Sequence, residues 1–210
     1  MHRPQHHPTA RPAPGRTAPG RGPDVPAPHR PPEHAAGHPV DTALPHPPPA
    51  RFPAAVADAL RAAGWYPGRR EMAQVEYWAD TLRAHRSPGG HRHTVHRAAV
   101  EAWAEFGGLP LAAPGPGVEI APTPVLINPL CGLHAARTLA DLGRALDAEI
   151  APLGQESDGA ALLAMDAEGR VYSLDHTGDW YLGRHLDAAL TSLLTGVRPV
   201  RLTTAPAPAH

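Results

Sequence analysis

The chain has 210 residues, a formal net charge of −1 at pH 7 and a single cysteine. One cysteine excludes an internal disulfide and a Cys-x-x-Cys metal site, and a near-neutral charge is not typical of a nucleic-acid-binding domain. The chain contains no lysine, which excludes the P-loop of nucleotide-binding enzymes. We therefore expect no nucleic-acid partner and no cofactor.

Residues 1–50 differ in composition from the rest of the chain. They hold 15 of the 28 prolines and 7 of the 15 histidines, but none of the aromatic residues. Such a segment cannot bury enough apolar surface to offset the entropy lost on ordering. We predict a disordered leader over 1–50, partly in polyproline II, one folded domain over 51–200 and a disordered tail over 201–210.

No targeting or membrane segment is evident in the chain. It has no apolar run of about 18 residues, so we expect no transmembrane helix. The N-terminal stretch lacks the apolar centre of a signal peptide. These features predict a soluble, cytoplasmic protein without a membrane partner.

The first predicted elements are helices. Apolar stripes at helical spacing predict a helix after Pro53, a second one carrying Trp78 and a third from Val95 to Phe106. We interpret the tryptophans on these stripes as core residues and not as an aromatic binding box. Between the first two helices, residues 65–70 form a predicted turn with two large aromatic side chains.

The second half of the chain mixes short strands with helices. The expected elements, in chain order, are two β-like pieces at 118–120 and 125–127, a helix over 133–148, a short strand at 150–153, a polar turn at 154–159, a hairpin over 162–174, a strand or turn at 180–183 and a helix over 184–195. Helices followed by a small, mostly antiparallel sheet and a C-terminal helix indicate an α+β fold.

The hairpin gives the clearest strand pattern. Residues 162–165 are apolar on both faces, so we predict an interior strand. Asp166 opens a turn, and Gly169 can take the positive φ that a short hairpin loop needs. In the second arm, Val171 and Ser173 point one way and Tyr172 points the other.

Two constellations resemble sites of metal binding or catalysis, and neither is complete. His93 and His96 lie three residues apart, but no carboxylate or cysteine lies nearby to complete a metal site, so we expect solvated loop histidines. Cys131 lies near His134, without a third residue to orient the imidazole, so we expect Cys131 to be a small buried residue. A hydrolase using this pair is the weakest hypothesis.

Acidic residues gather around the hairpin. Asp158, Asp175 and Asp179 each stand where a turn favours aspartate, and an EF-hand spacing is absent. Turn formation therefore explains them in part. Together they also form a candidate acidic rim that suits a basic partner.

A set of short motifs in this order resembles the SUKH-3 group of the Smi1/Knr4-related (SUKH) superfamily. The motifs are Phe-Pro at 52–53, Ala-Gly-Trp-Tyr-Pro-Gly-Arg at 63–69, Glu-Phe-Gly-Gly-Leu at 105–109, Pro-Leu-Gly at 152–154, Met-Asp at 165–166, Gly-Arg-Val-Tyr at 169–172 and Leu-Gly at 182–183. The resemblance spans about residues 52–198. It implies a SUKH-like α+β fold.

The resemblance also implies a function. Members resemble immunity proteins of bacterial polymorphic toxin systems, which bind and neutralise a cognate toxin domain, commonly a nuclease or a nucleic-acid deaminase. No catalytic set is implied, so we expect a binding protein and not an enzyme. A regulatory Smi1/Knr4-like interaction scaffold is the alternative.

Aromatic and arginine anchors dominate protein interfaces, which selects the candidate contact residues. The candidates are Trp65, Tyr66, Arg69, Trp180 and Tyr181, with Asp158, Asp175 and Asp179 as the acidic rim. For Trp65 we favour core packing over partner contact, because aromatic residues beside a glycine turn often plug a core.

Overall fold

The computed structural model describes residues 50–112 and 115–203. The predicted leader, 1–50, lies outside the described residues apart from Ala50, and so does most of the predicted tail. Arg201, which we assigned to the tail, belongs to the last strand.

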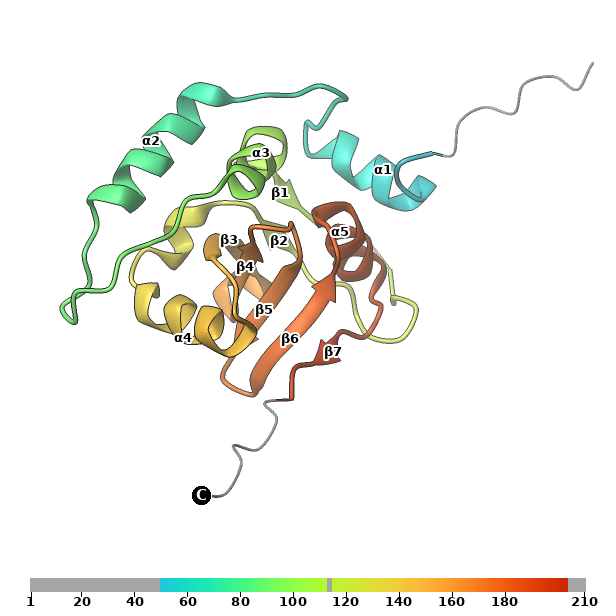
Figure 1. Ribbon diagram of the computed structural model, residues 1–210. Helices are drawn as coiled ribbons and strands as arrows, with labels where there is room; N and C mark the ends of the chain where they lie inside the picture. Colours follow the sequence, from blue (N-terminus) through green and yellow to red (C-terminus); the bar gives the residue numbers. More distant parts are fainter. Residues whose placement is uncertain (1–49, 113–114, 204–210) are drawn as a thin grey trace, which may run out of the picture. The chain divides into compact units, whose positions relative to one another are not determined.

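The described residues form five α-helices and one seven-stranded antiparallel sheet, which confirms the predicted α+β class (Figure 1). The strands lie across the sheet in chain order. The helices are α1 (Ala54–Ala62), α2 (Met72–Ala84), α3 (Arg97–Phe106), α4 (Ala136–Leu146) and α5 (Leu186–Thr195), with 3₁₀ turns η1 (Pro129–Gly132) and η2 (Ser157–Gly159). The strands are β1 (Pro110–Leu111), β2 (Val125–Leu126), β3 (Ile150–Glu156), β4 (Ala161–Asp166), β5 (Val171–Asp175), β6 (Gly178–Gly183) and β7 (Val200–Arg201).

The helices follow the predicted apolar stripes, with shorter ends. α3 begins at Arg97 because the His96 ring accepts a hydrogen bond from the Ala99 backbone N–H at 3.2 Å and so caps the helix. α4 begins at Ala136 and not at residue 133, because residues 133–134 form a turn directly after η1. α5 ends at Thr195, and the next residue, Gly196, adopts the left-handed conformation that often terminates a helix.

The central hairpin is confirmed as β4 and β5. Met165 pairs with Val171 and Leu162 with Leu174, and Gly169 at the turn has a φ of 90°. The buried Asp166 carboxylate accepts hydrogen bonds from the Arg170 backbone N–H at 2.8 Å and from the Tyr172 hydroxyl at 2.9 Å. The turn is therefore fixed by a side-chain network as well as by its glycine.

The predicted turn at 154–159 is wrong at its start, because β3 continues to Glu156. A bulge between Pro152 and Gly154 shifts the register of β3 against β4. Gly154 serves a close approach of β2: a Cβ at this position would lie 2.1 Å from the carbonyl oxygen of Leu126. The glycine marks a crowded strand and not a turn.

The β-like piece predicted at 118–120 is also wrong. These residues form bends, and the backbone N–H groups of Val118 and Glu119 donate to the carbonyl oxygens of Thr195 and Gly196 at 2.8 and 2.9 Å. This segment completes the C-terminal end of α5. The second predicted piece forms β2, and the two-residue strand β1 was not predicted.

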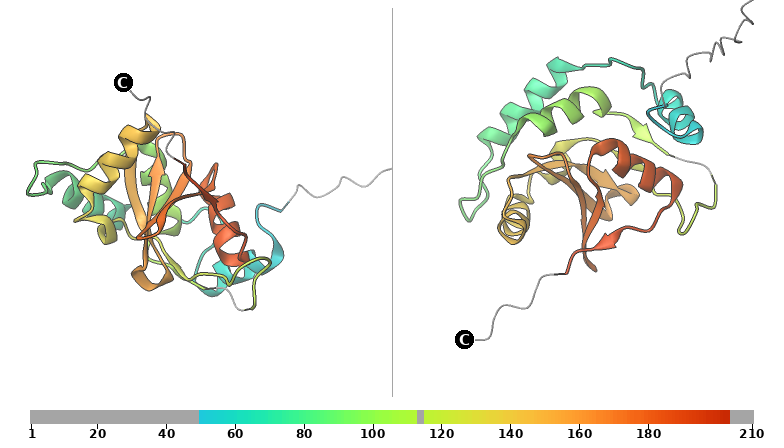
Figure 2. Two further views of the ribbon diagram at one scale, coloured as in Figure 1. Left: turned by 90° about the horizontal axis from the view of Figure 1, so that it is seen from below. Right: turned by 45° about the vertical axis from the view of Figure 1, so that its right-hand side comes forward.

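Both faces of the sheet are covered. One face, with Val171, packs against α3 and α5, whose other neighbours in the same core are α2 and α1, and the other face, with Tyr172, packs against α4. Figure 2 shows α4 and α5 on opposite sides of the strands. The fully buried Trp103 of α3 donates its indole N–H to the Pro152 carbonyl oxygen at 3.2 Å, so the helical layer is tied directly to β3.

Candidate partner-binding surface

The turn between α1 and α2 holds three of the predicted contact residues, and two of them are structural. Trp65 is 7% exposed and stacks on Phe106, so it packs in the core, as we predicted. The Arg69 guanidinium donates to the carbonyl oxygens of Glu105 and Gly107 at 2.8 and 2.9 Å. Tyr66, at 54% exposed, is the only one of the three with a large accessible surface.

The other predicted aromatic pair is divided between the two faces of the sheet. Trp180 lies opposite Ser173, and Tyr181 lies opposite Tyr172, with ring centroids 5.9 Å apart. Neighbouring residues of a strand point to opposite faces. Trp180 and Tyr181 therefore cannot contact a partner as one aromatic patch.

The three predicted acidic residues lie at one end of the sheet, where Asp179 of β6 pairs with Leu174, the neighbour of Asp175. Leu162 of β4 pairs with Leu174 of β5, which brings η2, with Asp158, to the same end as Asp175. Figure 1 places this end, with the β5–β6 turn, away from the connection between α1 and α2. The predicted site is thus two separate regions, and Tyr66 is remote from the acidic residues.

We define the sheet-end surface as Asp158, Asp175, His176, Asp179, Trp180, Arg198 and Arg201. Arg201 places its guanidinium carbon 5.7 Å from the centre of the Trp180 ring and donates to the Thr177 carbonyl oxygen at 2.7 Å. The rim is therefore of mixed charge, with two arginines among the aspartates, and not acidic throughout.

Asp175 and Asp179 have opposite electrostatic environments. Hydrogen bonds from Thr177, together with that of the Gly178 N–H at 3.1 Å, hold the pKa of the Asp175 carboxyl below its ordinary value. Burial raises the pKa of Asp179, and the negative charge of Asp175 adds to the effect. Asp175 is thus a turn residue whose ionised form the fold stabilises, whereas ionisation of Asp179 in the folded protein costs free energy.

A cavity of about 340 Å³ opens on the sheet-end surface between β5–β6 and the segment around Arg198. Its lining includes Asp175, Trp180 and two buried polar residues, Glu156 and Ser173. Sequence reasoning missed Glu156 by placing it in a turn. Ser173 carried a usable indication, since a serine on the inward face of a buried strand needs a polar partner.

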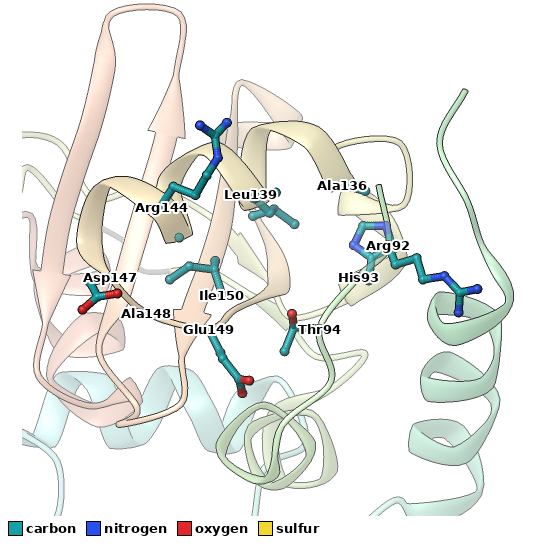
Figure 3. A pocket seen from close by; sticks show the side chains of 12 residues that line it. Arg92, His93, Thr94, Ala136, Leu139, Arg144, Asp147, Ala148, Glu149 and Ile150 are labelled. Carbon is teal, nitrogen blue, oxygen red and sulfur yellow. The ribbon is translucent and has the colours of Figure 1, made fainter. Parts of the chain in front are cut away.

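A second cavity, of about 420 Å³, lies between α4 and the segment before α3 (Figure 3). Leu139 and Ile150 give it an apolar wall, and Arg92, Arg144, Asp147 and Glu149 stand around it. The figure shows Arg92 extending away from α4. This cavity contains none of the predicted contact residues, and its rim has balanced charge.

The two histidines considered as metal ligands are partly buried and hydrogen-bonded, and are not fully solvated loop residues. The His93 Nε2–H donates to the Leu133 carbonyl oxygen at 2.8 Å, and the His96 Nε2–H donates to the Met165 carbonyl oxygen at 3.0 Å. Both rings are half-buried. Within residues 50–112 and 115–203, no group of three or more His, Cys, Asp or Glu residues is arranged to hold a metal ion.

Cys131 is exposed, so the prediction that it is a buried apolar residue is wrong. In η1 the inward residues are Pro129 and Gly132, three apart, and this turns Cys131 outward. The protein around the sulfur still desolvates the thiol in part and raises its pKa, the opposite of an activated nucleophile. His134 packs against His85, with ring centroids 5.4 Å apart.

The model of the SUKH-3 immunity protein family matches residues 52–196, which confirms the resemblance inferred from the motifs. No curated protein and no solved structure matches the chain. Among the helices that the structure describes, none combines the length and apolar character needed to cross a bilayer.

Proposed function

Because the chain belongs to the SUKH-3 immunity protein family, we propose that it binds and neutralises the toxin domain of a bacterial polymorphic toxin system. The family match over residues 52–196 is the observation that carries this proposal. The toxin is a nuclease or a nucleic-acid deaminase, and neutralisation occurs in the cytoplasm by a stoichiometric complex and not by catalysis.

The sheet-end surface is the proposed contact region. It combines an exposed rim, a partly exposed tryptophan and a cavity, as a central pocket with a polar rim does in known interfaces. A standard interface buries about 1,600 Å² in total, so the contact extends beyond the cavity. Tyr66 lies in a different region and is not included.

The aspartates of this region should attract a basic toxin surface and speed its association. A nuclease site that holds a polyanionic substrate is basic, and a surface with Asp158, Asp175 and Asp179 attracts it at long range. Arg198 and Arg201 moderate the field. Reversing the three aspartates is expected to slow association and to weaken its salt dependence; an unchanged rate would rule out this electrostatic role.

The experiment that tests the function uses the full chain as bait in lysate of the source cells, read by mass spectrometry. One dominant 1:1 partner with a C-terminal toxin domain, whose toxicity disappears on co-expression with this chain, would establish immunity. A spread of unrelated partners would favour the regulatory Smi1/Knr4-like scaffold instead.

A further inference from the structure

Two carboxylates are buried in the described part of the chain, and they differ in whether a cation pairs with them. Asp166, with no exposed surface, has a cationic partner, since the Arg170 Nε lies 2.5 Å from its Oδ2. Glu156, at 8% exposed, has only neutral donors: the Thr123 hydroxyl at 2.9 Å from Oε2, and the Ser173 hydroxyl on Oε1.

No arginine or histidine nitrogen of the described residues lies within 4.0 Å of the Glu156 carboxylate. Removing a carboxylate from water is costly unless it is paired with a cation and hydrogen-bonded. Glu156 meets the second condition and lacks the first. An unpaired carboxylate of this kind calls for an explanation.

The missing partner has a place to enter. Glu156 lines the cavity of about 340 Å³ at the sheet-end surface, together with Asp175 and the Trp180 side chain. Two carboxylates suit a cation, and the Trp180 ring, on which the Arg201 guanidinium lies at 5.7 Å, adds an apolar wall. The cavity opens to the surface at which we place the toxin domain.

We propose that this cavity receives the side chain of an arginine from the bound toxin domain, with Glu156 as its carboxylate partner. This inference rests on the proposed function and names the chemistry of the contact. Arginine fits better than lysine because its planar guanidinium can donate two parallel N–H bonds to a carboxylate and is more weakly hydrated.

Arg198 is the internal competitor for this position. It lines the same cavity, its backbone N–H donates to Glu119 Oε2 at 2.6 Å, and its guanidinium has no ion pair among residues 50–112 and 115–203. Its side chain brings a positive charge to the cavity that Glu156 lines. Removing it should therefore leave the cavity more available to an external guanidinium.

The test uses Nα-acetyl-arginine amide as the probe and Nα-acetyl-citrulline amide as its uncharged isostere. The full chain is titrated while the indole N–H resonance of Trp180 is followed by NMR; this nitrogen is buried and has no hydrogen-bond partner in the described structure. We expect millimolar binding of the arginine probe, tighter binding to Arg198→Ala, and binding about tenfold weaker to Glu156→Gln.

Glu76→Gln, which neutralises an exposed carboxylate on α2, is the matched control and should bind as the wild type does. Equal shifts with the citrulline probe, or no binding to either the wild type or Arg198→Ala, would overturn the inference. Neither result bears on toxin capture by the full chain. Failure of this contact and failure of the immunity function are therefore distinguishable.

Discussion

The indole of Trp65 stacks on the ring of Phe106, with centroids 6.2 Å apart and planes only 2° from parallel. Its Nε1–H donates to Glu105 Oε1 at 3.1 Å. The connection between α1 and α2 is thereby fixed to the end of α3. The residue that resembles an interface anchor in the sequence is a packing element of the helical layer.

Replacing Trp65 by alanine should lower the free energy of unfolding by about 3–5 kcal/mol, because a large buried side chain is lost and its cavity cannot fully collapse. Tyr66→Ala is the matched neighbour, and it should change stability by less than about 0.5 kcal/mol. Urea unfolding of both variants gives the comparison. Similar losses in the two variants would contradict the packing role of Trp65.

Arg69→Met should lower the free energy of unfolding by roughly 2 kcal/mol. The substitution keeps the aliphatic stem and removes both donors from the carbonyl oxygens of Glu105 and Gly107, which leaves the end of α3 without these hydrogen bonds. Arg70→Met is the control, since Arg70 is exposed. Chemical denaturation measures both, and a cost at Arg70 equal to that at Arg69 would argue against the capping role.

The sequence predicts most of this fold because its elements carry local patterns. Leu139 and Leu142 keep α4 on the sheet at helical spacing, and residues 162–165 identify β4 by their apolar character on both faces. The wrong predictions concern residues whose local preference differs from the role that long-range packing gives them. Gly154 is a typical turn residue, yet here it admits the backbone of β2, about 28 residues earlier in the chain.

The candidate site is harder to predict than the fold, because it depends on register. Glu156, Ser173 and Trp180 share one cavity only after β3, β4, β5 and β6 pair, and a bulge in β3 changes which residues face it. The turn preference of aspartate agrees with Asp175, whose carboxylate accepts hydrogen bonds from the Thr177 and Gly178 N–H groups. It gave no indication that Tyr181, next to Trp180, points the other way.

Asp179→Asn should raise the midpoint of thermal unfolding at pH 7. The pKa of Asp179 is raised on folding, so its contribution to stability is present below the unfolded pKa, about 3.9, and is lost as the pH rises through the folded value. At neutral pH the wild type therefore keeps an unfavourable charge. The gain, a few tenths of a kcal/mol at this partly exposed position, should vanish near about pH 3.

Asp175→Ala should have the opposite effect and lower the thermal midpoint at pH 7, by about 1 kcal/mol in free energy. It removes the acceptor of the Thr177 and Gly178 hydrogen bonds. The pKa of this carboxyl is lowered on folding, so its stabilisation is present above the unfolded pKa and is lost as the pH falls through the folded value. Equal and pH-independent changes in the two aspartate variants would refute both assignments.

His93 should make the domain less stable in mild acid. Burial lowers its pKa, and the neighbouring rings of His85 and His134 lower it further. The unfolded chain therefore binds this proton more readily, and stability falls as the pH drops through about 6.5. His93→Gln should lose less stability than the wild type between about pH 7.5 and pH 5.5 in urea unfolding. His134→Gln removes one of the repelling rings and should raise the pKa of His93 in an NMR titration; an unchanged value would show that the His134 ring does not contribute to the shift.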